Sequence, residues 1–399
     1  MDGVLLFIVS QLASSFFQGD GLNIFQGIYL VGIGWNEGSV GTALSLMGLT
    51  ALVMQTFAGD TIDKTTMDRR VFLAVASFVT ALSASAILLV HQGNQDHVLI
   101  FISKIIEGVS FSFIGPCLAA VTLATVGPNH FDSLMGSNLM WGHIGGLVAA
   151  GTAGLVAYLM YPDIKLCFLV IGASALGAVV FVQYLPEGDP QMGRGFRGKV
   201  AMDEFGRVES LDDEVDNNHK KQTTGDLEQS SSFISVPPIA ATYWEVISNR
   251  RSSVLCLTGF FYHFANANVL LVLGELMGEN DAEQEGPSRA AIPLIAGAVV
   301  LARVTMAIAT WLGQHLTSAG VGRKPLFMAG ILTLPLRCAL IIYWKDAGSS
   351  YLLSTQILDG LGGGFFGLLH PMLVADITFG SGRFNLLSTY CCALLVSPL

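Results

Sequence analysis

The sequence predicts an all-α integral membrane protein made of two related bundles of helices. Of its 399 residues, 52% are hydrophobic and only 13% are charged, and the mean hydropathy of +0.59 is too high for a soluble domain. Apolar runs of about 20 residues, the length of helix that crosses a hydrocarbon core, follow one another along the chain. Short polar features between these runs occur twice, which indicates a duplicated membrane unit.

The first half of the chain holds six apolar runs that we expect to form membrane-spanning helices. They cover residues 4–32, 38–58, 71–90, 98–126, 134–160 and 164–185. The second half holds four such runs, at 253–277, 290–312, 325–344 and 351–375, and a shorter one over 386–399. At about 1.5 Å per residue the last run cannot span a bilayer. We therefore expect a truncated second bundle, with an eleventh helix in part and no twelfth.

A polar segment separates the two bundles. Residues 186–249 are rich in Gly, Ser, Asp, Glu and Lys and are too polar to pack a core. We therefore predict three regions: an N-terminal six-helix bundle over residues 1–185, a mostly disordered linker over 186–249, and a C-terminal bundle over 250–399. The linker is expected to be a solvated tether, and a regulatory segment that is phosphorylated is the alternative.

Basic residues near the ends of the runs predict the orientation, because they favour the cytoplasm. With the N-terminus inside, most of them face the cytoplasm: Lys64, Arg69, Arg70, Arg250, Arg251, Arg323, Lys324 and Arg383. The N-terminus and the linker are then cytoplasmic. The net charge of −10 comes largely from the linker, and no basic stripe that would bind nucleic acid is present. We expect a monomer in a lipid bilayer.

The residues that carry enzyme chemistry do not occur in the arrangements that such chemistry needs. The sequence has no nucleophile elbow, no metal-ligand spacing and no nucleotide-binding motif. No enzyme activity, metal or cofactor is therefore expected. The six cysteines lie inside apolar runs, where buried free thiols are ordinary, and disulfide bonds are not expected.

Two polar features of the first half recur in the second. A glycine followed by a basic pair occurs as Gly59 with Arg69-Arg70, and 254 positions later as Gly313 with Arg323-Lys324. An acidic residue followed by glycine occurs as Glu107-Gly108, and 252 positions later as Asp359-Gly360. Many solute carriers are built from repeated halves, with the binding site at the seam between them.

The loop that contains the first copy resembles a known signature. Gly59-Asp60-Thr61-Ile62-Asp63-Lys64, continued by Asp68-Arg69-Arg70, looks like the loop that identifies the major facilitator superfamily. Lys104 with Glu107-Gly108 is similar to a second motif of that family. The resemblance covers the chain outside the linker. It implies the major facilitator fold, in which two six-helix bundles are related by pseudo-symmetry, here with the second bundle truncated. It also implies transmembrane transport by a secondary transporter.

In that family the signature loop latches the cytoplasmic side shut in one state. The resemblance therefore implies a conformational latch made of Gly59, Asp63, Arg69, Arg70, Arg323 and Lys324. We expect Gly59 to let the chain turn off its helix without a Cβ clash. Asp63 is expected to accept hydrogen bonds from amides at the N-terminus of a neighbouring helix. In the second copy Thr317 stands where the first has Asp63. The alternative is that the basic residues set topology alone.

Ionisable and polar residues within the apolar runs predict a water-filled cavity between the bundles, because a lone charge at mid-bilayer is costly. We expect a substrate and coupling cavity lined by Asp20, Asn23, Gln26, Lys104, Glu107, Asn138, His143, His263, Asn266, Arg303 and Asp359. His263 and Asn266, at i and i+3, would face Asn23 and Gln26 across it. The alternative for each histidine is a hydrogen bond within its own bundle.

Charged groups are expected to pair at one level of the membrane. Asp20 would pair with Lys104 and leave Glu107 free to carry a proton. A static ion network that sets the register of the helices is the alternative. Arg337 and Asp359 are expected to form a structural pair, while Arg303 would either meet an anionic solute or extend to the membrane surface.

These observations favour a secondary active transporter that moves a small organic solute by alternating access, with protons as the coupling ion. The alternative is a membrane protein that does not transport: a transporter-like sensor, or an inactive truncated fragment that cannot complete its second bundle. An integral-membrane enzyme would instead turn over a substrate without any gradient.

Overall fold

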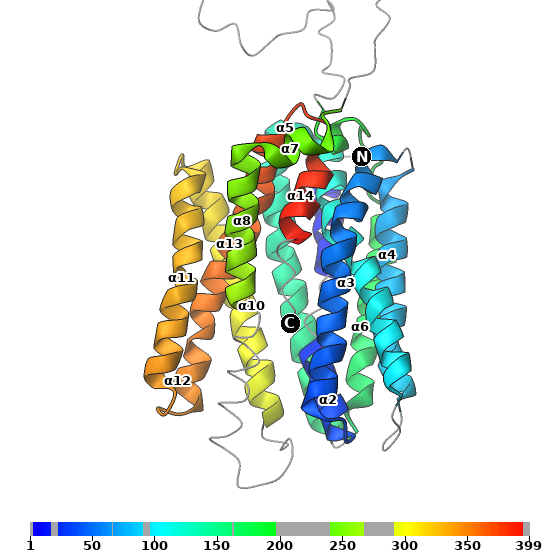
Figure 1. Cartoon of the computed structure of the whole chain (residues 1–399), viewed down its shortest axis with the longest axis vertical. Helices are drawn as coiled ribbons and strands as arrows, with labels where there is room; N and C mark the ends of the chain where they lie inside the picture. The colour runs from blue at the N-terminus through cyan, green and yellow to red at the C-terminus, as the bar shows by residue number, and fades with distance from the viewer. Residues whose placement is uncertain are drawn as a thin grey trace, which may run out of the picture.

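The computed structural model describes residues 3–16, 23–65, 67–90, 96–161, 163–196, 240–266 and 291–393. In these residues every regular element is a helix, and seven helices are long and apolar enough to cross a membrane. Figure 1 shows the helices running side by side along the long axis of the molecule. The predicted all-helical, multi-pass membrane fold is confirmed.

The first half of the chain follows the predicted apolar runs. It begins with α1 (Gly3–Phe16) and α2 (Asn23–Gly32), which divide the predicted run 4–32 between them. Residues 17–22, between these two helices, lie outside the described residues. Then follow α3 (Glu37–Lys64), α4 (Arg69–Ala84) with the 3-10 helix η2 (Ser85–Leu89), α5 (His97–Met160), η3 (Ile164–Phe168), α6 (Leu169–Val182) and the short η4 (Met192–Arg194).

The element α5, of 64 residues, consists of two helices that meet at Gly127, where we predicted two runs separated by a loop. It is not straight, because Gly127 has φ 69° and is followed by Pro128. Nδ2 of Asn138 donates to Oγ1 of Thr122 at 3.3 Å, although a straight helix would hold these residues about 24 Å apart. The chain therefore reverses at Gly127, and α5 supplies both predicted spans. The expected loop is reduced to a kink that glycine alone accepts without strain.

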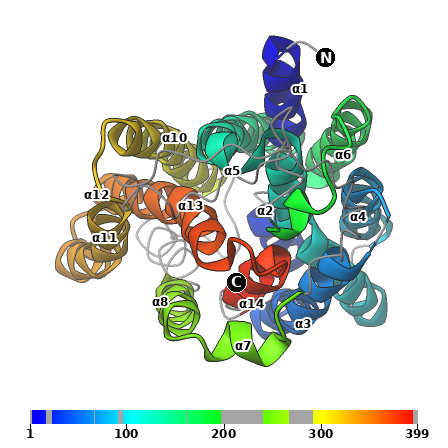
Figure 2. The same ribbon diagram turned by 90° about the horizontal axis from the view of Figure 1, so that it is seen from above.

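The second half of the chain contains the remaining helices. They are α7 (Tyr243–Ser248), α8 (Arg250–Asn266), α10 (Ala291–Ser318), α11 (Arg323–Trp344), α12 (Ser349–Ser354), α13 (Gln356–Thr378) and α14 (Phe384–Ala393). The predicted run 253–277 is described only as far as Asn266. Figure 2 shows α8 and α10 to α13 gathered on one side and the helices of the first half on the other, with α14 between them beside α3.

The repeat in the sequence is also a repeat in the packing. A Cβ atom on Gly108 of α5 would lie 3.0 Å from Cβ of Thr50 on α3. A Cβ atom on Gly360 of α13 would lie 2.5 Å from Cβ of Thr305 on α10. Thr50 and Thr305 are 255 positions apart, close to the 252 that separate the two glycines. Each half therefore brings the same two helices together at a glycine against a threonine.

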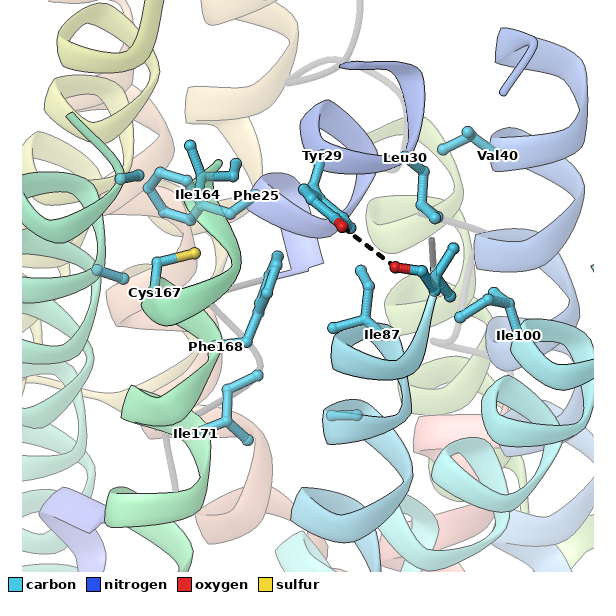
Figure 3. Close-up of a cluster of buried hydrophobic side chains, with 14 of the residues drawn as sticks. Phe25, Tyr29, Leu30, Val40, Ile87, Ile100, Ile164, Cys167, Phe168 and Ile171 are labelled. Atoms are coloured by element: carbon cyan, nitrogen blue, oxygen red, sulfur yellow. Dashed lines mark hydrogen bonds between the residues drawn. The ribbon is translucent and has the colours of Figure 1, made fainter. Parts of the chain in front are cut away.

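The two ends of the molecule are built differently. Residues 186–196 and α7, the described ends of the predicted linker, lie at the same end of the helices (Figure 1), which we call the linker side. At the opposite side, apolar side chains from α2, η2, α5 and η3 form a buried cluster (Figure 3). There the hydroxyl of Tyr29 donates to the carbonyl of Val90 at 3.4 Å, and its ring meets the edge of Phe168 at 5.8 Å between centroids.

One expectation about the cysteines is wrong. Cys117, Cys167 and Cys338 are free, but Cys256 of α8 is disulfide-bonded. The spacing of cysteines along the chain does not reveal which thiols meet in the folded protein.

Candidate functional site

Lys104 and Glu107 form a buried ion pair on the first part of α5. Nζ of Lys104 lies 2.8 Å from Oε2 of Glu107, and the two side chains are 3% and 4% exposed. Nζ of Lys104 also donates to Oε1 of Gln26 on α2. Residues three apart share one face of a helix, so the lysine and the carboxylate neutralise each other where a lone charge would be costly.

This pair corrects one part of the expected arrangement around Glu107. We predicted that Lys104 would pair with Asp20 and leave Glu107 without the lysine. Lys104 contacts Glu107 directly, because the i, i+3 spacing brings the two side chains together within one helix. Asp20 and the side chain of Asn23 lie outside the described residues, so the pairing of Asp20 with Lys104 stays a prediction.

Glu107 also borders a small cavity inside the first half. The cavity has a volume of about 40 Å³ and lies among α1, α4, α5 and α6. Its polar lining consists of Glu107, Ser77, Thr80 and Ser174. The volume is large enough for about one water molecule, and four polar side chains are enough to hold it. The carboxylate thus lies between a lysine and a small void whose lining is mostly apolar.

The second half contains its own buried charge cluster. Nη1 of Arg337 on α11 donates to Oδ1 of Asp359 on α13 at 2.7 Å and to Oδ1 of Asn266 on α8 at 2.7 Å. Nη2 of Arg337 donates to Oε1 of Gln356 at 3.3 Å. The arginine side chain is 1% exposed. Three helices are therefore tied together by one guanidinium, whose planar fork suits several acceptors at once.

Asn266 is held by the same charge cluster through both atoms of its amide group. Its amide oxygen accepts from Arg337, and its Nδ2 donates to Asp359 at 3.3 Å. Gln26, which we expected opposite Asn266 across a cavity, bonds to Lys104 in the other half. Both amides are engaged within their own halves, and the expectation that they face each other across a cavity stays a prediction.

The predicted histidines have different surroundings. His263 meets the edge of the Phe366 ring at 5.0 Å between centroids, and His370 stacks on the same ring at 5.6 Å. His263 is thus part of an aromatic cluster inside the second half. His143 lies on the second part of α5, which packs along α10, and it is close enough to Arg303 of α10 for the two to interact electrostatically.

Asn138 and His143, two of the predicted polar residues, differ in their hydrogen bonding. Asn138 accepts from Oγ of Ser10 on α1 at 2.9 Å and donates to Thr122, so it joins helices within the first half. Nδ1 of His143 is buried and has no hydrogen-bond partner within the described part of the chain. Of these two, only His143 offers a nitrogen to a further partner.

Asp63 connects the two halves at the linker side. Its side chain is buried, and its Oδ2 accepts from the backbone amide of Leu386 at 2.8 Å. Oδ1 accepts from Nδ2 of Asn385 at 2.8 Å and from the backbone amide of Asn385 at 3.3 Å. These amides open α14 of the second half, and a helix N-terminus stabilises an anion. Next to them, Asp60 pairs with Arg383 at 3.1 Å.

Gly59 has a different role from the one that we expected. It lies inside α3, not at a turn. A Cβ atom on Gly59 would stand 2.0 Å from Oγ1 of Thr389 and 2.6 Å from the carbonyl oxygen of Asn385. The glycine is needed because α14 crosses α3 at this point and leaves no room for a side chain.

The second copy of the loop makes other contacts. Thr317, which replaces the aspartate, donates to the carbonyl of Gly313 in its own helix at 3.0 Å. Nε2 of Gln314 donates to the carbonyl of Ser133 in the first half at 2.9 Å. Arg323 pairs with Asp132 in the first half and with Asp376 in the second, while Lys324 is exposed. The two copies therefore both join the halves, but only the first uses a carboxylate on a helix end.

The basic pair of the first copy stays within the first half. Nη2 of Arg70 lies 2.9 Å from Oε1 of Glu187, and Arg69 is buried and donates to the carbonyl of Pro190 at 3.1 Å. Asp68 caps α4. Partial burial would raise the pKa of Asp68, but the hydrogen bonds and charge of Arg70 outweigh it and hold that pKa below its usual value.

Sequence reasoning missed the segment that receives these arginines. Residues 186–196 were taken into the polar linker, yet Phe196 is only 6% exposed. Nδ2 of Asn385 donates to the carbonyl of Gly193 at 3.0 Å, and the amide of Gly380 donates to the carbonyl of Gly195 at 2.7 Å. A phenylalanine that follows glycines in an otherwise polar stretch was the available signal.

Two related helical halves, each with a buried ion pair, joined at one end by polar contacts, have the architecture of a membrane transporter. The family profile described as Major Facilitator Superfamily matches residues 5–378. The chain belongs to this superfamily, as its signature loop predicted. Membership indicates a transporter and not an enzyme.

Two curated relatives support the assignment. Both are uncharacterized MFS-type transporters of Mycobacterium tuberculosis, from strains CDC 1551 and H37Rv. Each is 30% identical to this chain over 370 residues, which make up 92% of this chain and 77% of the relative.

Solved structures have the same fold. The proton:xylose symporter XylE superposes with a TM-score of 0.65 at 14% identity, covering 98% of this chain and 85% of that one. The Escherichia coli fucose:proton symporter FucP gives 0.62 at 14% identity, covering 99% and 89%. The nucleoside transporter NupG gives 0.57 at 15% identity, covering 99% and 89%. At these identities the likeness concerns the fold alone.

Proposed function

We propose that the protein is a secondary active transporter that moves a small polar organic solute across a membrane by alternating access. The observation that carries this proposal is the bond between Asp63 and the start of α14 in the other half. Hydrogen bonds to a carboxylate contribute about 1.5 to 3 kcal/mol each, and water can replace them when the halves separate. Such a contact can hold one state without locking it.

The neighbouring contacts support the same role. Asp60 with Arg383 and Arg323 with Asp132 also join the two halves at the linker side, and each pair is partly exposed. Exposed ion pairs contribute about 0 to 1 kcal/mol, so they can break and re-form at little cost. We infer that the linker side is closed in this structure and that opening it breaks this set of contacts together.

The orientation follows from the charges on that side. Exposed or partly exposed basic residues gather there, among them Lys64, Arg250, Arg251 and Lys324. Positive residues favour the cytoplasmic face. We infer that the linker side is cytoplasmic, and that the latch predicted from the sequence, with Gly59, Asp63 and the basic residues of both loops, acts there.

We infer the kind of solute from buried polar atoms that have no hydrogen-bond partner among the described residues. Nδ1 of His143 and Nε2 of Gln26 are buried and have no hydrogen-bond partner among the described residues. An imidazole nitrogen and an amide donor suit a solute with hydroxyl or carboxylate oxygens. The solved structures with this fold include a xylose symporter and a nucleoside transporter, and sugars and nucleosides carry hydroxyl groups of that kind.

Proton coupling is the finer part of the proposal, and it rests on Glu107. The carboxylate forms an ion pair with Lys104 and borders a small cavity that also has three hydroxyl side chains in its lining. When Glu107 takes up a proton, its charge attraction to Lys104 is lost, while the hydrogen bond from Lys104 to Gln26 on α2 remains. Protonation would therefore shift α2 relative to α5 and link proton uptake to the position of the helices that flank the centre.

Proteoliposomes containing a pH-sensitive dye test the proposal. Addition of D-xylose, L-fucose or uridine should acidify or alkalinise the lumen with the wild-type protein and not with Glu107→Gln, which keeps the shape and removes the charge. Asp346→Asn, an exposed carboxylate at the opposite side, is the matched control and should behave as wild type. Solute flux without any proton movement would contradict proton coupling but not transport. A protein whose two halves never separate would favour the alternative of a sensor that does not transport.

A further inference from the structure

The structure assigns a third component to the gate at the linker side, in addition to the two loops of the repeat. This component is residues 186–196, which we call the strap. We propose that the strap moves with the first half and must release Phe196 from the second half each time the linker side opens. The inference rests on the proposed alternating access, but it concerns residues outside the repeated loops.

The first part of the strap is bound to the first half. It continues from α6, and the backbone amide of Asp189 donates to the carbonyl of Ala124 in α5 at 2.8 Å. Nη2 of Arg69 donates to Pro190, and Nη2 of Arg194 donates to the carbonyl of Thr65 at 2.7 Å. All of these bonds join the strap to residues of the first half, so a separation of the two halves leaves them intact.

The last part of the strap is bound to the second half. The carbonyls of Gly193 and Gly195 accept from Asn385 and Gly380, respectively. The ring of Phe196 lies against Gly382: a Cβ atom there would stand 2.1 Å from Cζ of the phenylalanine. Gly382 also has φ 68°, a conformation that other residues rarely adopt. The loop after α13 thus forms a seat that a side chain at position 382 would close.

Asn385 joins the strap to the gate. Its Nδ2 donates both to Asp63, at 2.8 Å, and to the carbonyl of Gly193, at 3.0 Å. A separation of α3 from α14 therefore pulls on the strap as well. The strap is fixed to the first half through Asp189, Pro190 and the side chain of Arg194. The separation therefore has to break the bonds of Gly193, Gly195 and Phe196 to the second half and leaves those of Asp189 intact.

The other end of the predicted linker is tied to the same loop. The amide of Ala241 donates to the carbonyl of Ser381 at 2.9 Å, and Nε of Arg383 donates to the carbonyl of Ala241 at 2.8 Å. The described ends of the linker therefore meet on residues 380–383. Release of Phe196 separates the two described ends of the linker. The strap is therefore the point at which the linker can affect the opening of the linker side.

Spin labels test the inference without any solute. Labels on Met67→Cys in the first half and Lys324→Cys in the second, in a background without other free cysteines, report the width of the linker side by electron double resonance. Phe196→Ala should raise the population with a long distance by about tenfold or more, since the lost burial of a phenylalanine is worth at least that factor. Phe196→Leu should raise it less. Tyr184→Ala, an exposed aromatic residue ahead of the strap, is the control and should leave it unchanged.

A second variant and a crosslink provide independent tests in case Phe196→Ala folds poorly. Gly382→Ala fills the seat and should widen the linker side as Phe196→Ala does. A disulfide between Phe196→Cys and Ser381→Cys should hold the distance short until it is reduced. If Asp63→Asn widens the linker side and the strap variants only lower the melting temperature, the strap is structural packing and the inference is wrong. If no variant, Asp63→Asn included, changes the distance, alternating access itself fails.

Discussion

Asp63 of the first half caps the helix α14 of the second half, with its carboxylate 2.8 Å from the backbone amide of Leu386. The contact is possible because Gly59, one turn earlier on α3, lets α14 approach so closely that a Cβ atom would stand 2.0 Å from Thr389. A charge on a helix end and a glycine that permits the approach therefore work as one unit. The contact exists only while the two halves lie together at the linker side.

Replacing Asp63 by asparagine should open the linker side. A charge at a partly buried helix N-terminus contributes about 1 to 2 kcal/mol, which corresponds to a factor of about 5 to 30 in an equilibrium constant. The distance between labels on Met67→Cys and Lys324→Cys should shift to longer values by that factor in population. Asp346→Asn serves as control. An unchanged distance distribution in Asp63→Asn would show that the carboxylate does not hold the halves together.

Gly59→Ala should separate α3 from α14. The added methyl group cannot fit against Thr389 and the carbonyl of Asn385, so the helices must move apart or the protein must lose stability, at a cost of about 1 to 3 kcal/mol. Gly41→Ala, on the same helix, is the matched control, because a Cβ atom there meets nothing within 4 Å. Melting temperatures in detergent compare the two. Equal stability of both variants would contradict the packing at Gly59.

Lys104→Met should destabilise the first half strongly. It leaves the carboxylate of Glu107 buried without its cation, and breaking a buried pair in this way costs about 3 to 5 kcal/mol. The double variant Lys104→Met with Glu107→Gln removes both charges and should recover most of the loss. Thermal unfolding of the two single variants and the double variant measures the coupling. Simple addition of the two single losses would mean that the residues do not interact.

Arg323→Ala should affect the gate less than Asp63→Asn. Arg323 pairs with Asp132 and Asp376, but the three side chains are partly exposed, and such pairs contribute about 0 to 1 kcal/mol. We expect at most a roughly fivefold change in the open population, which is the factor that 1 kcal/mol produces. Double resonance with a label on Lys324→Cys would be disturbed by its neighbour, so a label on Met328→Cys is used instead. A larger effect than that of Asp63→Asn would reverse the ranking of the two copies.

The sequence was sufficient for the fold because its signal is local. The length of each apolar run predicts a span, and α3, α4, α6, α10 and α11 coincide with such runs. The repeat was also legible, since residues 252 and 254 positions apart keep their types. The predicted runs placed the reversal of the chain within α5 correctly. They did not show how tight the turn is, because that depends on the backbone torsion of Gly127, which composition does not reveal.

The partners of the charged residues could not be predicted in the same way. We did not predict the contact of Lys104 with Glu107 or that of Asn266 with Arg337, because the depth of a residue in the membrane is compatible with several partners. The contacts of Asn385 and Arg383 with Asp63 and Asp60 join residues more than 300 positions apart. Such pairings depend on how the two halves meet.

The most direct test of the account measures the two ends of the molecule together. Labels on Met67→Cys and Lys324→Cys report the linker side, and labels on Met160→Cys and Lys345→Cys report the opposite side, each pair in its own sample in lipid nanodiscs. Alternating access predicts that a change such as Asp63→Asn lengthens the first distance and shortens the second. If the two distances lengthen together, or if the linker side keeps a single short distance in every variant, the two halves do not alternate and the protein is not the transporter proposed here.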